Sequence, residues 1–294
     1  MKSGFISIIG RPNVGKSTLL NALLGEKIAI TTDKPQTTRN RIRGIYTDEE
    51  AQMVFLDTPG IHKPRNKLGR YMTEEALTSV DDVDIVLFVV DDLLESGRGD
   101  AYILEAIRDA AVPKFLLINK IDKMAPEKYR QIFEEYDAMG IFDGIYGISA
   151  KEGINLPSLI AALKTRLPNG PAYFPEDAIM DSPERFLVSE IIREKLLMYL
   201  SEEVPHGVAV EIESYEELPA LTKIGAVIYC EKKSHKSIII GKGGRKLKGI
   251  GKSAREDIQK LVGTKVYLSL WVRVKENWRD SDFMLSNFGY KEES

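Results

Sequence analysis

The chain has 294 residues, enough for two domains of ordinary size, and its hydrophobic fraction of 43% and charged fraction of 29% are typical of a soluble globular protein. No apolar run approaches the roughly 20 residues that a membrane-spanning helix needs, so we expect no integral membrane protein. No signal or transit sequence precedes the first predicted strand, and the single cysteine, Cys230, cannot form an internal disulfide. We therefore expect a cytoplasmic protein.

The first recognisable pattern is strand, glycine-rich loop and helix. An apolar run at 6–9 leads into a loop with the spacing G-x-x-x-x-G-K-[ST], and an amphipathic run at 18–24 follows. In such a loop, backbone N–H groups and a helix N-terminus surround phosphate oxygens. Lys16 would bridge the β- and γ-phosphates, and the Ser17 hydroxyl would bind Mg²⁺. The predicted phosphate-binding residues are Gly10, Arg11, Pro12, Asn13, Val14, Gly15, Lys16, Ser17 and Thr18.

A polar segment at 28–44 is predicted to be a mobile loop because it has little apolar periodicity. Thr38 in this loop is placed to complete the Mg²⁺ shell when a γ-phosphate is bound. A solvated polar loop without that role is the alternative.

Two strands are predicted next, at 43–47 and 51–56, and the second ends in the motif Asp57, Thr58, Pro59, Gly60. Asp57 would reach Mg²⁺ through its water shell, and the N–H of Gly60 would reach the γ-phosphate. Loss of that phosphate would release residues 61–70, which makes this segment a predicted switch. Lys16, Thr38 and Gly60 are the predicted catalytic residues.

Base recognition is predicted at the ends of two later strands. A strand at 84–91 and a helix at 99–111 precede the strand 114–118, which ends in Asn119, Lys120, Ile121 and Asp122. A carboxylate at Asp122 accepts both the ring N–H and the amino group of guanine, whereas adenine has no such donor pair. A strand at 144–148 ends in Ser149, Ala150 and Lys151, whose backbone N–H groups are placed for the guanine carbonyl, and a helix is predicted at 156–167.

In this order and at these strand ends, the motifs resemble the GTPase domain of the translation-factor-related class, and residues 10–18 with 36–39 are similar to the Era-type branch. Ile61 stands where Ras-like GTPases have the glutamine that orients water, so we expect slow intrinsic hydrolysis. Related GTPases with asparagine at the position of Asn13 use K⁺. Our hypothesis is that K⁺ assists here through Asn13 and backbone carbonyls of residues 31–38.

The second half begins with a proline-rich linker at 171–183. A helix is predicted at 185–200, strands at 208–213, 226–231 and 265–275, a helical turn at 236–240, the loop 241–244 and a basic helix at 245–261. This order is that of a KH domain of type II, which begins with a helix. The predicted domains are therefore a GTPase domain at 1–170 with a mixed, mostly parallel sheet and helices on both faces, the linker, and an α+β KH domain with a C-terminal tail at 184–294.

Charge is uneven in this second domain. Residues 181–230 contain ten acidic and four basic residues, whereas residues 232–255 contain nine basic residues and no acidic one. Glycines let the backbone approach sugar-phosphate groups, and Lys242 supplies charge there. A nucleotide site in the same stretch is disfavoured because no acidic ribose partner frames it. The predicted RNA-binding residues are Ile238, Ile239, Gly241, Lys242, Gly243, Gly244, Arg245, Lys246 and Lys248.

The resemblance to Era GTPases covers essentially the whole chain. It implies binding of single-stranded RNA near the 3′ end of 16S rRNA, a role in 30S subunit maturation, and peripheral association with the inner face of the cell membrane. We expect a monomer that alternates between GTP and GDP and holds RNA in one state. Two alternatives remain: a phosphoryl-transfer enzyme acting on a small molecule, which the base-recognition motifs disfavour, and an RNA scaffold in which the nucleotide is structural.

Overall fold

The computed structural model describes residues 1–32, 34, 36–92 and 98–290. It divides into two compact units, the first mainly Met1–Thr31, Thr38–Arg65 and Gly69–Asp181, the second mainly Ser182–Ser294. Each unit has its own hydrophobic core. No described helix is both long and apolar enough to span a bilayer.

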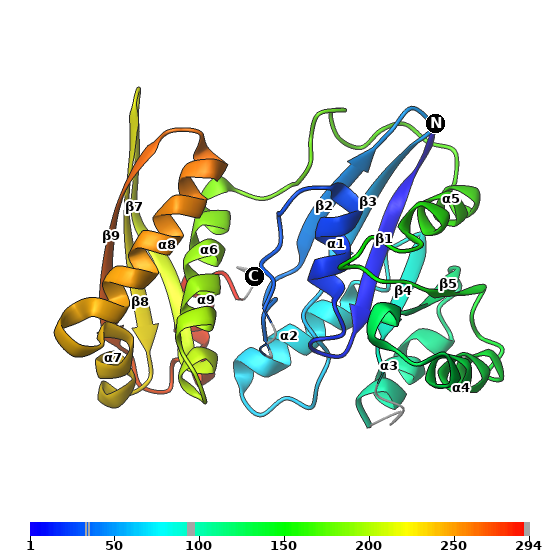
Figure 1. The fold of residues 1–294 in the computed structure, drawn as a ribbon, viewed down its shortest axis with the longest axis horizontal. Helices are drawn as coiled ribbons and strands as arrows, with labels where there is room; N and C mark the ends of the chain where they lie inside the picture. The colour runs from blue at the N-terminus through cyan, green and yellow to red at the C-terminus, as the bar shows by residue number, and fades with distance from the viewer. Residues whose placement is uncertain (33, 35, 93–97, 291–294) are drawn as a thin grey trace. The chain divides into compact units, whose positions relative to one another are not determined.

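The first unit is built on a six-stranded sheet with the strand order β2-β3-β1-β4-β5-β6 (Figure 1). Only β2 runs antiparallel to its neighbour. Strands β3, β4 and β5 are buried along their whole length, as expected for strands covered on both faces. The strands are β1 (Lys2–Gly10), β2 (Ile42–Thr47), β3 (Ala51–Asp57), β4 (Ile85–Val90), β5 (Lys114–Ile118) and β6 (Gly144–Gly147).

Helices cover both faces of this sheet. One face packs through a cluster that contains Ala76, Ile103 and Ile132 from α2 (Lys67–Thr78), α3 (Arg98–Arg108) and α4 (Pro126–Asp137). The other face is covered by α1 (Lys16–Leu24) and α5 (Leu156–Arg166) (Figure 1). The mixed α/β sheet predicted from the sequence is confirmed. Helices α2 and α4 were not predicted from the sequence, and α2 begins inside the predicted switch segment 61–70.

The predicted linker is not free along its length. Buried Gln52 on β3 accepts the N–H groups of Tyr173 and Phe174 through its side-chain oxygen, at 2.7 and 2.9 Å, and donates to the carbonyl of Phe174 at 2.9 Å. Further along, the Ile45 N–H donates to the carbonyl of Ile179 at 2.8 Å. Residues up to Asp181 therefore belong to the first unit, because the sheet edge supplies hydrogen bonds that their composition does not reveal.

The second unit has a three-stranded sheet in which β8 (Leu221–Cys230) pairs antiparallel with β7 (Val208–Leu218) and parallel with β9 (Lys265–Val274). Three helices pack on one face of it: α6 (Glu184–Tyr199), α7 (Lys233–Ile240) and α8 (Arg245–Val262). The element order α-β-β-α-α-β confirms the predicted KH architecture. Strands β7 and β8 are longer than predicted because they form a hairpin that extends to Leu218 and Leu221.

Residues 276–290, in the predicted C-terminal tail, form ordered structure. A 3₁₀ turn at Trp278–Asp280 and a short helix, α9 (Asp282–Asn287), follow β9. Trp278 is fully buried, its indole N–H donates to the carbonyl of Gly207 at 3.0 Å, and its ring contacts Phe288 and Tyr290. Trp278 therefore holds this segment to the second unit.

Candidate functional site

The predicted phosphate loop, residues 10–17, connects β1 to α1 at the carboxyl edge of the first sheet. Gly10 and Gly15 have φ values of 155° and 102°, which favour glycine. A Cβ atom on Gly15 would lie 2.3 Å from the side-chain nitrogen of Asn119, so this glycine also permits close packing of two loops. The Nζ of Lys16 donates to the carbonyls of Gly10 and Arg11. Burial lowers the pKa of Lys16 to about 8, although nearby Asp57 opposes the shift.

The three predicted Mg²⁺-binding residues lie together. The Ser17 hydroxyl donates to Oδ2 of Asp57 at 2.6 Å, the Thr38 hydroxyl donates to the same oxygen at 3.2 Å, and the two hydroxyls are 2.8 Å apart. Burial raises the pKa of Asp57, while Lys16 and these hydroxyls lower it. Asp57 Oδ1 is buried without a hydrogen-bond partner among the described residues. Hydroxyl and carboxylate oxygens at this spacing fit a hard cation such as Mg²⁺.

Gly60 and Ile61 lie against the phosphate loop. A Cβ on Gly60 would approach Pro12 to 2.7 Å, and the N–H of Ile61 donates to the carbonyl of Gly10 at 3.2 Å. The Ile61 side chain is 1% exposed and belongs to the hydrophobic core of the first unit. It therefore faces away from the phosphate side, as well as lacking a polar group that could orient water.

The predicted base loop, Asn119–Asp122, is joined to the phosphate loop by side chains. Asn119 donates to the carbonyl of Val14 at 2.8 Å, and Lys120 Nζ donates to the carbonyl of Asn13 at 2.8 Å. The Asp122 carboxylate accepts the Ser149 hydroxyl at 2.6 Å, which fixes its orientation. The structure thus brings residues from the ends of β1, β5 and β6 to one edge of the sheet.

Two of the three backbone N–H groups of Ser149, Ala150 and Lys151 already donate hydrogen bonds within the protein. The N–H of Ser149 donates to the carbonyl of Ile154, and that of Ala150 donates to the side-chain oxygen of Asn119 at 3.0 Å. Within the described chain, the N–H of Lys151 has no hydrogen-bond partner.

Two carboxylates that the sequence motifs did not indicate contact the predicted loops. Asp91 follows β4, accepts a hydrogen bond from Arg11 at 3.1 Å and another from Lys120 at 2.8 Å. Asp100 on α3 accepts from Arg11 at 2.8 Å. The position of Asp91 at the end of a buried strand was a usable signal, because that edge carries the other site residues.

The predicted RNA-binding loop, residues 241–244, joins α7 to α8 in the second unit. Gly241, Gly243 and Gly244 have φ values of 71°, 60° and 74°, all in the left-handed region. A Cβ on Gly241 would also meet the Cβ of Lys246 at 2.7 Å. Glycine is therefore required at this turn by conformation and by space.

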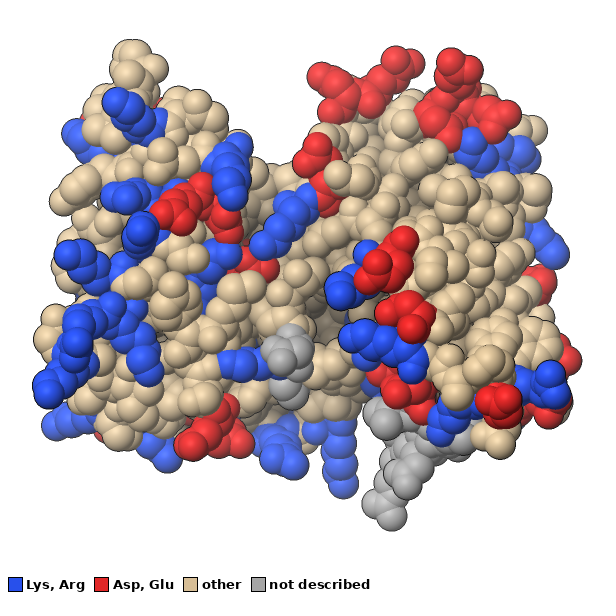
Figure 2. Space-filling model, in the orientation of Figure 1, with Lys and Arg blue, Asp and Glu red and all other residues tan. Residues whose placement is uncertain are grey.

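The side chains around this loop differ in exposure. Lys242, Arg245 and Lys248 are exposed, and Figure 2 shows Lys and Arg side chains gathered over α7 and α8. Ile238 is 42% exposed, but Ile239 is fully buried in the KH core. The prediction that Ile239 contacts RNA needs correction: its side chain points under the surface because helical spacing turns it toward the sheet.

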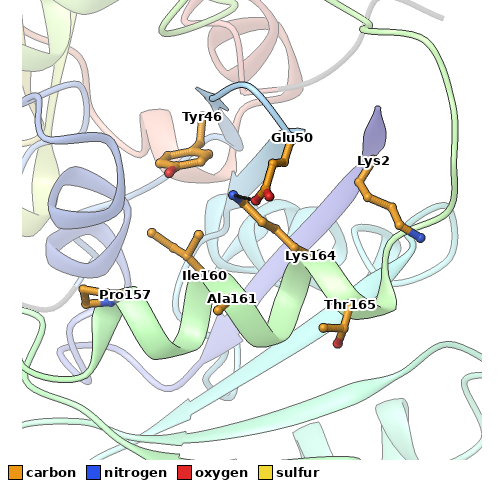
Figure 3. A pocket seen from close by; sticks show the side chains of 8 residues that line it. All are labelled: Lys2, Tyr46, Glu50, Pro157, Ile160, Ala161, Lys164 and Thr165. Atoms are coloured by element: carbon orange, nitrogen blue, oxygen red, sulfur yellow. Dashed lines mark hydrogen bonds and ion pairs between the residues drawn. The ribbon is translucent and has the colours of Figure 1, made fainter.

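A separate pocket of about 670 Å³ lies on the first unit between α5 and the β2–β3 hairpin (Figure 3). Its lining includes the apolar side chains of Pro157 and Ile160 and the ion pair between Lys164 and Glu50 at 2.7 Å. None of the predicted site residues lines it, so this pocket is not the nucleotide site.

Two family models match the chain. A model described as a 50S ribosome-binding GTPase matches residues 5–120, and a KH-domain model matches residues 203–279.

Full-length relatives match as well. The chain is 56% identical over 292 residues to GTPase Era of Alkaliphilus metalliredigens (strain QYMF), with 99% of both chains covered. It is 58% identical over 291 residues to GTPase Era of Alkaliphilus oremlandii (strain OhILAs), covering 98% of this chain and 99% of that protein.

Two solved structures resemble the whole chain. A crystal structure of Era in complex with MgGDPNP and nucleotides 1506–1542 of 16S ribosomal RNA has a TM-score of 0.95 and 41% identity, covering 99% of each chain. A variant of Aquifex aeolicus Era bound to GDP·AlF₄⁻ has a TM-score of 0.93 and 40% identity, again covering 99% of each.

Proposed function

The chain belongs to the Era family of GTPases, and from this premise we propose that it couples GTP binding and hydrolysis to the holding of single-stranded RNA near the 3′ end of 16S rRNA, during 30S subunit assembly. The GTPase-domain family is described by binding to the 50S subunit. We assign this chain to the small subunit because its relative of known structure, which matches the whole chain, is bound to 16S rRNA.

The observation that carries the nucleotide part of the proposal is the convergence of Ser17, Thr38 and Asp57 within hydrogen-bond distance of one another. These residues would hold Mg²⁺, which neutralises charge on the β- and γ-phosphates when bound. Lys16 supplies a further positive charge, and a bound phosphate would raise its lowered pKa again.

Each remaining residue of the nucleotide site has a distinct task in this proposal. Asp122, oriented by Ser149, accepts the donor pair of guanine, and the N–H of Lys151 donates to the guanine carbonyl. Gly60 brings its N–H to the γ-phosphate while packing against Pro12. Because Ile61 lies in the core, water must be oriented by another group, and we infer slow intrinsic hydrolysis.

The RNA part rests on the glycine loop at 241–244 and the exposed cations beside it. Ile238 offers an apolar surface to bases, while Lys242, Arg245, Lys246 and Lys248 offer charge to the backbone. A GTPase domain at 1–170, a linker at 171–183 and a KH domain at 184–294 remain our proposed functional division. In the fold, however, the first unit includes the segment up to Asp181.

The decisive experiment measures RNA affinity in two nucleotide states. We expect a 16S 3′-terminal oligonucleotide to bind the full chain more tightly with GDPNP than with GDP. Bound RNA should then raise the ratio of GDPNP affinity to GDP affinity by the same factor. Equal RNA affinities in the two states would remove the switch and leave the scaffold hypothesis. Stimulation of turnover by a small metabolite and not by RNA would favour the phosphoryl-transfer alternative.

We further propose that K⁺ assists hydrolysis through Asn13 and carbonyls of the loop 31–38, of which residues 33 and 35 lie outside the described residues. Asn13 has a left-handed φ of 66°, which turns the backbone at this point of the phosphate loop. Turnover in K⁺ buffer should exceed turnover in Na⁺ buffer at equal ionic strength, and equal rates would refute the role.

Membrane association and oligomeric state are also proposals. We propose a monomer in the cytoplasm that associates peripherally with the inner face of the membrane. Sedimentation of the purified chain with and without vesicles of bacterial lipid tests both statements at once, because it reports the mass of the free protein and the bound fraction.

A further inference from the structure

A cluster of charged side chains links the phosphate loop to the base loop. Asp91 lies directly after β4, and in the sheet β4 lies between β1 and β5, the strands that precede the two loops. Its side chain is 8% exposed. One carboxylate oxygen accepts from the Arg11 guanidinium at 3.1 Å, and the other accepts from Lys120 Nζ at 2.8 Å.

The same two loops are tied at neighbouring points. Lys120 Nζ also donates to the carbonyl of Asn13, and the backbone N–H of Asn119 donates to the carbonyl of Val90 at 2.8 Å. The end of β4 therefore contacts the base loop through its backbone and both loops through the Asp91 side chain.

Asp100 holds the other side of Arg11. Its side chain is 1% exposed, and Oδ1 accepts from Arg11 Nε at 2.8 Å. Burial raises the pKa of Asp100 to about 6, although Arg11 lowers it, so the carboxyl is ionised at neutral pH. Two carboxylates thus engage the Arg11 guanidinium from two sides.

We propose that Asp91 is a positioning residue of the GTPase, because its carboxylate joins Arg11 of the phosphate loop to Lys120 of the base loop and sets the spacing that one guanine nucleotide must span. Asp100 keeps Arg11 in the orientation that this bridge needs. This inference rests on the proposed nucleotide site. Pre-arranged loops bind more tightly because they lose less freedom on binding.

The proposal separates binding from chemistry. Asp91 contacts neither Ser17, Thr38 nor Asp57 by any hydrogen bond within the described residues, so its loss should weaken nucleotide binding and leave the hydrolytic step alone. With slow hydrolysis, KM follows the dissociation constant, so KM reports binding and kcat reports chemistry.

The test uses the full chain, steady-state GTP hydrolysis and the dissociation rate of fluorescent mant-GDP. Asp91→Asn should raise KM and the dissociation rate by about 10- to 100-fold, the value of a hydrogen bond to a charged group, with kcat within about twofold. Asp91→Glu should restore part of the loss. The exposed neighbour supplies the matched control: Asp92→Asn should leave both quantities unchanged.

A second variant distinguishes loss of the bridge from misfolding of Asp91→Asn. Arg11→Gln removes the cation while Asp91 stays, and the effects of Arg11→Gln and Asp91→Asn should be less than additive, because both break one bridge. A lower melting temperature with unchanged KM and unchanged mant-GDP release in these variants overturns the positioning role. Failure of the unmodified chain to bind mant-GDP would instead refute the proposed nucleotide site.

Discussion

The two candidate ligand-binding regions differ in the burial of their lysine side chains. Lys16 in the phosphate loop is 6% exposed and donates to backbone carbonyls, whereas Lys242 in the glycine loop is exposed and forms no ion pair among the described residues. The first region is arranged before its ligand arrives, and the second offers charge to solvent. We infer that geometry governs affinity at the nucleotide site and that salt-dependent attraction contributes strongly at the RNA site.

The largest expected effect is at the base loop. Asp122→Asn should weaken GTP binding by about 10³- to 10⁴-fold. The side-chain NH₂ of asparagine would face the N–H donors of guanine, so one acceptor of the donor pair is lost. Xanthosine triphosphate, which has a carbonyl in place of the amino group, should recover much of the affinity. Calorimetry with both nucleotides measures this, and tight GTP binding by the variant would show that Asp122 does not select the base.

The next largest effect concerns the folded C-terminal segment and uses the two tryptophans of the chain. Trp278→Ala should lower the free energy of unfolding by about 3–5 kcal/mol, because Trp278 is fully buried. Trp271 is 51% exposed, so Trp271→Ala should change the free energy of unfolding by no more than about 0.5 kcal/mol. Urea denaturation followed by circular dichroism compares them, and equal losses would contradict the packing role of residues 276–290.

A smaller effect is expected at the glycine loop. Lys242→Ala should weaken binding of a single-stranded 16S 3′ oligonucleotide by about tenfold at low salt and reduce the salt slope by about 0.7. Lys260, which pairs with Asp257 at 3.1 Å, gives the control, and Lys260→Ala should bind nearly as the unmodified chain does. Fluorescence anisotropy across a salt series measures both slopes. An unchanged slope for Lys242→Ala would place the phosphate contacts elsewhere.

The smallest effect is at the ion pair between Lys164 and Asp48, 2.6 Å apart, beside the α5 pocket. Burial alone would raise the pKa of Asp48, but hydrogen bonds from Lys164, two backbone N–H groups and Tyr46 lower it from 3.8 to about 2. The pair therefore stabilises the fold above about pH 4 and loses this contribution as the pH falls through about 2.

Lys164→Met should return the pKa of Asp48 toward 3.8 and cost under about 1 kcal/mol at neutral pH, as expected for a solvent-screened pair. Nuclear magnetic resonance titration of the Asp48 carboxyl carbon follows this shift directly. A pKa that stays near 2 in the variant would show that the backbone N–H groups and Tyr46 lower it without Lys164.

The sequence by itself determined the fold class and the motifs of both candidate sites. Each motif is a short run with its own spacing, such as Gly10–Ser17 or Gly241–Gly244, and each sits at the end of a strand or between two helices that apolar periodicity reveals. Local backbone chemistry was sufficient there, because glycine, lysine and aspartate are required by conformation or by ligand.

The tertiary structure decided what joins these motifs. The bridge from Asp91 to Arg11 spans 80 positions, the bonds from Gln52 to Tyr173 and Phe174 span 121 and 122, and Trp278 reaches the carbonyl of Gly207 across 71. The same holds for Ile239, whose burial depends on the sheet beneath it. Such contacts leave no local period in the sequence, since they form only when packing of the cores offsets the entropy of bringing distant segments together.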